Sequence, residues 1–430
     1  MKTSTYNELF NMADDSYIIY NHLHKKLVKI CSPERDLLNL PTSLLDYLKA
    51  NDFLVDDNID ENYVAMVKYN DYIFDNTLRL VLLPNEECNF SCTFCYEKFN
   101  KVCMDDGILK KLILYLRKNI TKYSSLDIDW FGGEPLLSKN FIYKFSEQAI
   151  DLCKLAKIPY VASITTNGYL LDDETISRLL KCGVRNFHVT LCGDESEHDE
   201  IRYLSNGGKT FSRIIQNLQK FKSLTTHSFK VVIRINVTNR TLKNLHVFID
   251  KLYDLFGDDS RFTFYYRPVG DWGGEKVKAM SEDINIDHKR LFNSVFSAKK
   301  MLNYDIYYTM LVSNICASAK RNNYVIRANG DINKCTESLY SSYNKIGFLD
   351  NNGNMNIDTE LLGKWLFSHK KADECGLCTK YTVCKNNKCP NTNFDFSSKR
   401  EPYCGYDDIA IEEVIKILDG SNSKYISVLL

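Results

Sequence analysis

From residue 78 to about residue 268 the chain alternates short β-rich runs with stretches in which apolar residues recur at helical spacing. Such alternation predicts a parallel sheet covered by helices. Six strand–helix repeats are too few for an eight-fold closed barrel, so the sequence predicts an α/β fold with a partial six-fold barrel, open on one side. The expected strands are residues 78–84, 126–131, 160–165, 186–191, 231–237 and 262–266. The expected helices cover residues 105–123, 211–221, 241–256 and about 288–302, and two more begin at Ser138 and Asp172.

Three cysteines follow the first expected strand at the spacing C-x3-C-x2-C: Cys88, Cys92 and Cys95. Each iron of a four-iron cube needs its own protein ligand, so three thiolates leave one iron open for a ligand that is not protein. Alternatives are a zinc site short of one ligand and part of the ligand set of an electron-transfer ferredoxin. A ferredoxin run, however, spaces its cysteines by two residues and ends in Cys-Pro, whereas this motif continues with Tyr96 and Glu97.

With the aromatic Phe94 before its last cysteine, the motif resembles the signature of the radical S-adenosylmethionine (SAM) superfamily. The resemblance implies that the amino and carboxylate groups of SAM chelate the open iron. It also implies that one electron from the cluster cleaves SAM to methionine and a 5′-deoxyadenosyl radical. The expected cofactors of this first site are therefore SAM and a 4Fe-4S cluster on the three cysteines.

Polar or glycine-rich motifs follow the other expected strands, where partial barrels place their chemistry. Taken alone, the Gly-Gly-Glu-Pro sequence at 132–135 could be a tight turn, but about 40 residues after the cysteines it matches the family motif that binds the SAM amino group. The family usually has Asp where this chain has Cys192, which leaves the role of that position open. An Arg downstream of that position meets the SAM carboxylate in the family. The SAM contacts that the resemblance implies are Gly132, Gly133, Glu134, Thr166, Asn167, Thr190, Arg202 and Asn236.

A second set of cysteines lies beyond residue 300 in Asn- and Tyr-rich sequence. Its spacing resembles the seven-cysteine SPASM extension of peptide-modifying radical SAM enzymes, although one interval is a residue longer; a pair of zinc ribbons is the alternative. The resemblance implies two auxiliary 4Fe-4S clusters, and hence three clusters in all. It also implies an open iron in the inner cluster, because no eighth cysteine precedes the set. The implied ligands are Cys316, Cys335 and Cys389 for the inner cluster and Cys375, Cys378, Cys384 and Cys404 for the outer cluster.

Residues 17–30 predict a β-hairpin, and the apolar pattern after Pro33 predicts short helices. This order resembles the leader-recognition element of many peptide-modifying radical SAM enzymes, while a packing cap on the barrel is the alternative. In the first case a leader would pair with the hairpin near residues 17–20. The expected domains are therefore 1–77 (leader recognition or cap), 78–300 (radical SAM core), 301–410 (SPASM) and 411–430 (a C-terminal helix or tail).

Lys plus Arg equals Asp plus Glu at 55 each, so the net charge indicates neither a nucleic acid nor a membrane partner. The sequence shows no signal peptide and no uncharged stretch long enough to span a bilayer, so a cytoplasmic protein is expected. Five of its 15 cysteines have no assigned role: Cys31, Cys103, Cys153, Cys182 and Cys192.

Together these features predict a radical SAM/SPASM peptide maturase that forms a sulfur-to-carbon thioether in a ribosomally made precursor peptide. Its expected partners are that precursor with its leader, and a reductant such as flavodoxin or ferredoxin. The alternatives are carbon–carbon crosslinking, formylglycine formation by a sulfatase-maturating enzyme, and a non-enzymatic iron–sulfur electron-transfer module. Formylglycine formation is disfavoured because the sulfatase maturases have an Asp base directly after the second SPASM cysteine, where this chain has Thr336.

Overall fold

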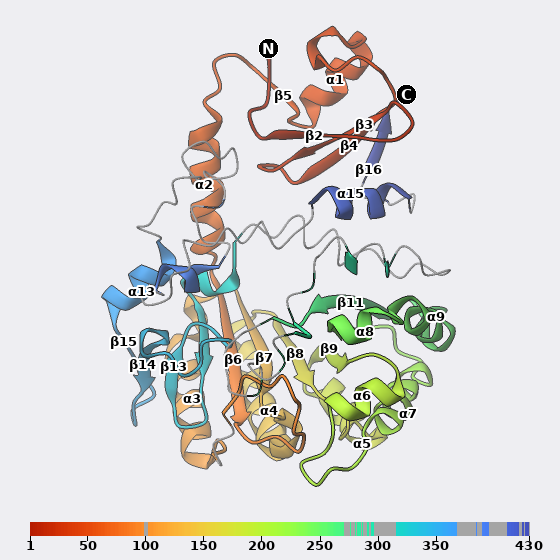
Figure 1. Cartoon of the computed structure of the whole chain (residues 1–430). Coiled ribbons are helices and arrows are strands. Elements are labelled where there is room, and N and C mark those ends of the chain that lie inside the picture. The colour runs from red at the N-terminus through yellow and green to blue at the C-terminus, as the bar shows by residue number, and fades with distance from the viewer. Residues whose placement is uncertain are drawn as a thin grey trace. The chain divides into compact units, whose positions relative to one another are not determined.

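The computed structural model describes residues 1–98, 102–270, 315–367, 389–394, 411–420 and 426–429, together with residues 276, 280, 282–284, 286, 290, 291, 294, 295, 384 and 424. The described residues fall into two compact units (Figure 1). The first takes its residues from Met1–Asp75, Tyr304–Arg321 and Lys364–Leu430, and the second from Asn76–Asn303 and Asn322–Gly363. The region after residue 300 is shared between the two units.

The second unit is built on a sheet whose six predicted strands are all present. They lie side by side and parallel in the order β11-β10-β9-β8-β7-β6, so that neighbours in sequence are neighbours in space. In the described part of the chain β11 is an edge strand, which leaves the sheet open as predicted. The strands are β6 (Thr77–Asn85), β7 (Ser125–Gly132), β8 (Tyr160–Thr166), β9 (Val184–Leu191), β10 (Lys230–Val237) and β11 (Phe262–Pro268).

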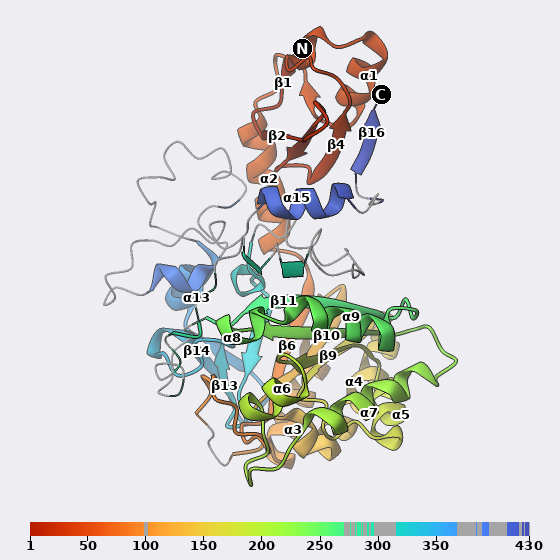
Figure 2. The same ribbon diagram turned by 45° about the vertical axis from the view of Figure 1, so that its right-hand side comes forward.

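Helices connect these strands and cover the sheet (Figure 2). Two of them begin at aspartate caps: Asp105 accepts a hydrogen bond from the Ile108 N–H, and Asp172 accepts one from the Thr175 N–H. The predicted sixth helix, at 288–302, lies largely outside the described residues. The connecting helices are α3 (Asp106–Asn119), α4 (Lys139–Ala156), α5 (Asp173–Lys181), α6 (Glu195–Ile201), α7 (Phe211–Lys222), α8 (Asn239–Leu242) and α9 (Leu245–Phe256), with 3₁₀ turns η2 (Ile120–Lys122) and η3 (Pro135–Ser138).

The two faces of the sheet differ in polarity. In β10 the side chains of Val231, Ile233 and Ile235 are fully buried, whereas the alternate positions include Arg234 and Asn236. Because side chains alternate between the faces of a strand, the apolar set faces one side and the polar set the other. The polar face therefore carries the residues that are available for chemistry.

The sheet continues beyond β6 in a way that the sequence did not predict. Strand β12 (Asn323–Ile326) pairs in parallel with β6, and β13 (Asp331–Asn333), β14 (Lys345–Leu349) and β15 (Met355–Ile357) follow as antiparallel neighbours. These strands have three to five residues each, which is too short for a clear alternating pattern. This region also contains the 3₁₀ turn η5 (Ser342–Asn344), and α13 (Thr359–Leu366) includes the division between the units at residue 364. The 3₁₀ turns η4 (Ala317–Ala319) and η7 (Pro390–Asn393) belong to the first unit.

The first unit contains a four-stranded sheet in the order β16-β4-β3-β2. The predicted hairpin is formed by β3 (Tyr17–Asn21) and β4 (Lys26–Ile30), with β2 (Asn7–Asn11) beside β3. Strand β16 (Ile426–Leu429) pairs in parallel with β4, so part of the predicted C-terminal tail belongs to this sheet. The other elements are β1 (Lys2–Thr3), β5 (Leu54–Val55), η1 (Leu37–Asn39), α1 (Thr42–Ala50), α2 (Glu61–Ile73) and α15 (Ile411–Gly420).

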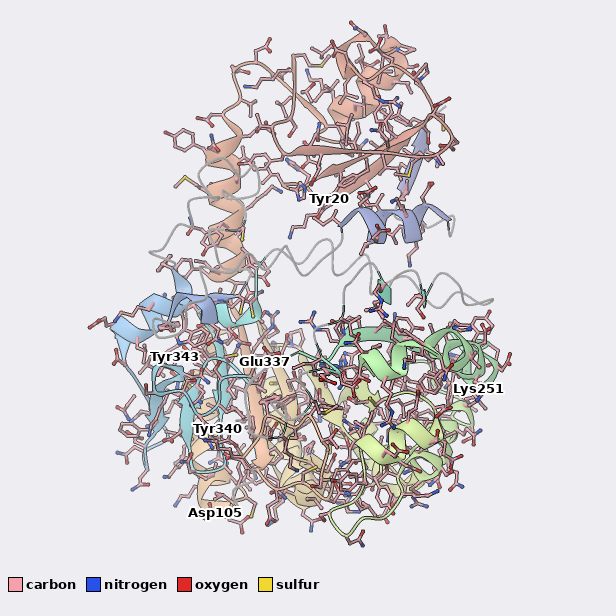
Figure 3. The ribbon with its side chains drawn as sticks, viewed as in Figure 1. Tyr20, Asp105, Lys251, Glu337, Tyr340 and Tyr343 are labelled. Carbon is pink, nitrogen blue, oxygen red and sulfur yellow. The ribbon has the colours of Figure 1, made fainter. Side chains whose placement is uncertain are left out.

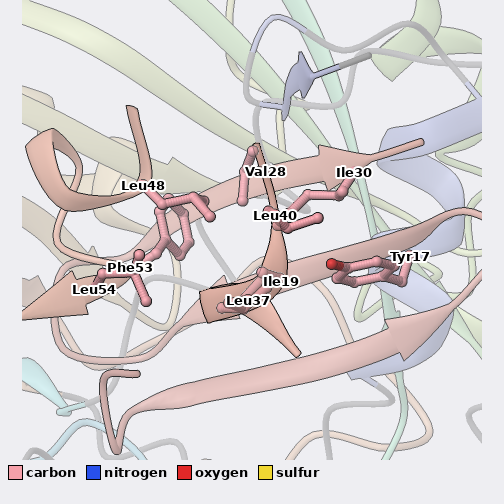
Figure 4. Packing of buried hydrophobic residues seen from close by; sticks show 9 residues of the cluster. All are labelled: Tyr17, Ile19, Val28, Ile30, Leu37, Leu40, Leu48, Phe53 and Leu54. Carbon is pink, nitrogen blue, oxygen red and sulfur yellow. The ribbon is translucent and has the colours of Figure 1, made fainter. Parts of the chain in front are cut away.

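The apolar core beside this sheet explains why apolar residues recur at helical spacing in the sequence after Pro33. Leu37, Leu40 and Leu48, from the predicted helical segment, pack against Tyr17 and Ile19 of β3 (Figure 4). The prediction that a leader pairs with residues 17–20 was wrong about the strand, because β3 already has β2 on one side and β4 on the other. In the described residues the edges of this sheet are β2 and β16.

Candidate functional site

The three cysteines of the C-x3-C-x2-C motif line one pocket of about 180 Å³ on the polar face of the central sheet. The pocket is also lined by the ends of β7 and β8 with the residues that follow them, by Thr190 of β9 and by Arg202 after α6. Cys92 is buried and the other two cysteines are partly buried, and all three are free thiols. Seven of the eight predicted SAM contacts line the same pocket: Gly132, Gly133, Thr166, Asn167, Thr190, Arg202 and Asn236. Glu134 is the one that does not.

Backbone hydrogen bonds hold the cysteine loop against the segment around Arg202. The Ser91 N–H donates to the Tyr203 carbonyl at 2.8 Å, and the Thr93 N–H donates to the Ile201 carbonyl at 3.0 Å. The Ser205 N–H closes the same contact by donating to the Asn89 carbonyl at 2.9 Å. These bonds bring Arg202 to the cysteine loop although about 110 residues separate them in sequence.

The glycine pair after β7 permits a close approach of two backbones. A Cβ on Gly132, whose φ is 110°, would lie 2.5 Å from the Asn85 carbonyl oxygen. A Cβ on Gly133 would lie 2.2 Å from the carbonyl oxygen of Glu87, the residue before the first cysteine of the motif. Both glycines are therefore needed to seat the cysteine loop, in addition to any contact with a ligand.

Glu134 is fully buried, and its carboxylate makes inward contacts. It accepts hydrogen bonds from the Thr166 hydroxyl at 2.7 Å, the Asn167 N–H at 2.7 Å and the Leu136 N–H at 3.0 Å. Burial raises the pKa of this carboxyl, and the three donors oppose that rise. In this structure Glu134 positions two pocket residues, Thr166 and Asn167.

Asn167 joins the third strand's loop to the cysteine loop. Its side-chain amide donates to Asn89 Oδ1 at 2.7 Å, while its own Oδ1 accepts from the Tyr169 N–H at 3.0 Å. The nitrogen and the oxygen of the Asn167 side-chain amide thus each bind a different segment, which fixes the orientation of the side chain in the pocket.

Arg202 presents an unpaired cation to the pocket. The residue is 7% exposed, and its Nε has no hydrogen-bond partner within the part of the chain that the structure describes. Its guanidinium lies 5.8 Å from the ring centroid of Phe90 in the cysteine loop. A buried guanidinium without a carboxylate partner favours an anionic ligand, and its planar donors match a carboxylate.

The position where Cys192 replaces the family's Asp is part of the protein core. Cys192 is fully buried, and burial raises the pKa of its thiol to about 12. Its N–H donates to His198 Nδ1 at 3.2 Å, and His198 Nε2 lies 3.2 Å from the Thr210 hydroxyl. Burial also holds the pKa of His198 well below its usual range, so this imidazole is neutral. Cys192 is not among the residues that line the pocket.

The donor set fits an iron–sulfur cluster. Burial raises the pKa of the Cys88 thiol, and raises that of Cys95 to about 12, so these sulfurs need a positive partner to become thiolates. Among the described residues no three His, Cys, Asp or Glu side chains converge as ligands of a single metal ion. A four-iron cube does not need that convergence, because each cysteine binds a different iron.

Sequence comparison gives the domain its family. The model of the Radical SAM superfamily matches residues 82–251, a segment that includes the three cysteines and Arg202. Residues 82–251 therefore resemble a radical SAM domain, and this match implies an enzyme that uses SAM and a 4Fe-4S cluster. The residues that would hold them are those of the pocket described above.

The relatives are distant. Over 209 residues the chain is 23% identical to the Fe-coproporphyrin III synthase of Methanosarcina barkeri (strain Fusaro), covering 47% of this chain and 46% of that protein. The chain thus spans about half the length of that curated relative.

Two solved structures share the fold. The anSMEcpe structure with bound AdoMet and the Kp18Cys peptide has a TM-score of 0.59 at 18% identity, and the likeness covers 80% of this chain and 99% of that one. Streptococcus suis SuiB bound to its precursor peptide SuiA has a TM-score of 0.52 at 17% identity, covering 93% of this chain and 97% of that one. Both likenesses support the predicted fold class.

Sequence analysis missed several residues of the pocket in the radical SAM domain. Arg234 is the most polar of them, and the signal that could have found it is its place two residues before Asn236 on the same face of β10. The others belong to the cysteine loop and to strand ends: Phe90, Phe94, Tyr96, Glu97, Phe131, Thr165, Pro268 and Val269.

The second set of cysteines is described in part. Cys316, Cys384 and Cys389 belong to the first compact unit and Cys335 to the second, and Cys375, Cys378 and Cys404 lie outside the described residues. Cys335 is placed by Asn344, whose side-chain oxygen accepts from the Cys335 N–H at 2.9 Å. Beside it the Tyr96 hydroxyl, from the cysteine loop, donates to the Thr336 carbonyl at 3.4 Å.

Within the described residues no helix is long and apolar enough to cross a membrane.

Proposed function

We propose that this radical SAM enzyme is a maturase of a ribosomally made precursor peptide and forms a sulfur-to-carbon thioether in it. The observation that carries the proposal is the pocket, where three free thiols and the unpaired Arg202 lie together. The fold likeness to two structures with a bound peptide supports a peptide substrate. The second set of cysteines supports additional clusters that would accept the electron released when carbon and sulfur join.

The bound SAM and its cluster would supply a 5′-deoxyadenosyl radical, which removes a hydrogen atom from a substrate carbon. The chain's own residues bind and orient the cofactor. We assign the cluster to Cys88, Cys92 and Cys95, and the SAM carboxylate to the Arg202 guanidinium. Thr190 and Asn236 provide polar contacts, and the backbone at Gly132 and Gly133 borders the amino group, with Glu134 holding Thr166 and Asn167 behind them.

The auxiliary clusters are part of this proposal. The inner one would use Cys316, Cys335 and Cys389, and the outer one Cys375, Cys378, Cys384 and Cys404, which gives three 4Fe-4S clusters in all. An inner set of only three cysteines leaves room for a substrate thiolate, which is the reason for preferring thioether formation to carbon–carbon crosslinking. We also propose that the first unit recognises the leader, that flavodoxin or ferredoxin supplies the electron, and that the enzyme works in the cytoplasm.

Formylglycine formation is the enzyme alternative that the residues disfavour. The position of the proposed base is Thr336, whose hydroxyl is a poor base at neutral pH. Fe-coproporphyrin III synthase, a relative over 47% of this chain, suggests a tetrapyrrole substrate as the other candidate. The extended likeness to SuiB, over 93% of the chain, favours the peptide.

The test is anaerobic reconstitution with iron, sulfide, SAM and a chemical reductant, followed by incubation with Cys-containing precursors from neighbouring genes. We expect 5′-deoxyadenosine and a peptide two mass units lighter whose cysteine no longer reacts with iodoacetamide. Loss of two mass units from a Cys-free precursor would show that the enzyme forms a carbon–carbon bond and not a thioether. Absence of 5′-deoxyadenosine from a fully iron-loaded enzyme would contradict the proposed function altogether.

A second measurement addresses the leader. A folded variant that lacks residues 1–75 should keep SAM cleavage, because the six parallel strands of the barrel begin at Thr77. Its affinity for the precursor should fall. Unchanged affinity would favour the packing-cap alternative.

A further inference from the structure

The pocket of the radical SAM domain contains a second guanidinium besides Arg202. Arg234 lies on β10, where its register partners are Thr190 on β9 and Tyr265 on β11. Thr190 also lines the pocket. Arg234 therefore belongs to the strand wall of the pocket, whereas Arg202 follows helix α6 and contacts the cysteine loop.

One nitrogen of Arg234 is used to orient the side chain. Its Nε donates to Asn236 Oδ1 at 2.8 Å, a bond between two residues on the same face of β10. The two terminal nitrogens make no ion pair with any residue that the structure describes. A guanidinium held in this way keeps the two-pronged edge that matches a carboxylate.

Other arginines of the same unit are neutralised by protein carboxylates. Arg79 pairs with Asp127, Arg261 with Asp259 and Arg327 with Glu86. Arg234 has no carboxylate partner among the described residues, and it differs from Arg185 of β9, whose terminal nitrogen donates to the Leu180 and Val184 carbonyls. Taking a cation out of water without a counter-ion costs free energy, so such a residue is expected to face an anion that the protein itself does not supply.

The charged groups near Arg234 do not supply that anion. Burial lowers the pKa of Arg234, and nearby Arg267 lowers it further, while Tyr265, Glu337 and Tyr96 oppose the shift. Glu337, labelled in Figure 3, is an exposed residue two positions after Cys335 and forms no ion pair with Arg234. Glu97 lines the same pocket, but no described carboxylate forms an ion pair with the Arg234 guanidinium.

We propose that Arg234 is a specificity-determining residue that binds a carboxylate of the substrate, namely an Asp or Glu side chain of the peptide close to the carbon that loses its hydrogen. This inference rests on the proposed function and adds the class of residue that the substrate must carry. SAM has one carboxylate, and Arg202, which is bonded through its own segment to the cysteine loop, is placed to receive it. The second cation is then left for the substrate.

The experiment compares synthetic peptides in binding to the reconstituted, SAM-loaded enzyme. Each 12-residue probe contains one Cys and, at one of the four positions after it, either Glu or Gln. We expect the best Glu probe to bind the wild type about tenfold more tightly than its Gln twin, because a charge-assisted hydrogen bond is stronger than one to a neutral amide. In Arg234→Gln this preference should disappear, and in Arg234→Lys part of it should remain, because the charge stays but the fork is lost.

SAM affinity, measured on the same proteins, separates the two arginines. Arg234→Gln should bind SAM within about twofold of the wild type, whereas Arg202→Gln should bind it at least tenfold more weakly. Arg178→Gln, on the exposed surface of α5, is the matched control and should change neither quantity.

Three results would overturn the inference. Equal binding of the Glu and Gln probes by the wild type would exclude a carboxylate requirement. A loss of SAM affinity in Arg234→Gln, with the peptide preference intact, would assign Arg234 to the cofactor. Arg234-dependent binding of coproporphyrin III without any Glu preference would indicate that the carboxylate bound by Arg234 belongs to a tetrapyrrole substrate. Because these are binding measurements, they stand apart from turnover: absence of 5′-deoxyadenosine contradicts the proposed function alone.

Discussion

The two larger sheets among the described residues are assembled from chain segments at very different separations. In the central sheet the six parallel strands from β6 to β11 are neighbours in the order in which they occur in sequence. In the first unit, β4 at residues 26–30 pairs with β16 at residues 426–429. The central sheet carries a polar pocket at its strand ends, whereas the sheet of the first unit is built around an apolar cluster. We propose that the first unit recognises the leader, and on that proposal chemistry and recognition are carried by structures that should fail independently.

The largest expected effect concerns the pocket of the central sheet. Changing Cys88, Cys92 and Cys95 together to Ala should abolish 5′-deoxyadenosine formation, because the open-iron cube loses all its protein ligands. Iron content should fall by about four of roughly twelve atoms per chain if all three clusters fill. The variant should still bind the precursor leader, as measured by fluorescence anisotropy. Loss of leader binding in a folded variant would show that the two structures do not act independently.

The next effect follows from the buried carboxylate behind the pocket. Glu134→Ala would leave the Thr166 hydroxyl and the Asn167 and Leu136 N–H groups without their acceptor. We expect it to lower the free energy of unfolding of the central unit by about 3 kcal/mol or more, since each unsatisfied buried group costs about 1–3 kcal/mol. Urea unfolding measures this. Glu134→Gln keeps one acceptor oxygen and should lower the free energy of unfolding by less. If neither change altered this free energy, the positioning role of Glu134 would be contradicted.

A pH effect of intermediate size is expected from His198. Its pKa in the folded protein is lowered by burial, so its contribution to stability is present above its unfolded pKa, about 6.5, and is lost as pH falls below that value. The cost should approach about 1.4 kcal/mol per pH unit between pH 6.5 and pH 5. The measurement is the difference in unfolding free energy between pH 7.5 and pH 5. His198→Gln should show a smaller difference, and an equal one would assign the acid sensitivity to other groups.

The smallest effect on catalysis is expected from removing β16. Deleting residues 424–430 uncovers the edge of β4 and removes the partly buried Leu429 from the apolar cluster. Precursor binding should weaken, while 5′-deoxyadenosine formation without peptide should stay within about twofold of the wild type. Deleting the same number of residues from the exposed turn around Asn352 is not a suitable control, because Lys118 of α3 donates to its carbonyl. A Val428→Asp change, on an exposed position of the same strand, serves instead.

Much of the central unit could be predicted because its signals are local. Each parallel strand was marked by a β-rich run and each connecting helix by its apolar spacing, and the cysteine spacing together with Gly132 and Gly133 located the pocket. Arg234 was missed because a single Arg in a strand carries no motif, and only the finished sheet shows that it faces the cysteines. Strands β12 to β15 were missed because they are short and depend on the edge of β6. Glu134 was found, but the sequence could not show that its carboxylate turns inward.

The pairing of β4 with β16 also sets an order of events during synthesis. Lys29 of β4 pairs with Asp419, which lies 390 residues later in the chain. At about 5–20 residues per second, a ribosome needs on the order of 20–80 s to make that interval. The six strands from β6 to β11, by contrast, each leave the ribosome soon after the neighbour in sequence with which they pair. The central unit can therefore fold while the chain is still being made, whereas the sheet of the first unit keeps the edge of β4 unpaired until the last of its four strands has left the ribosome.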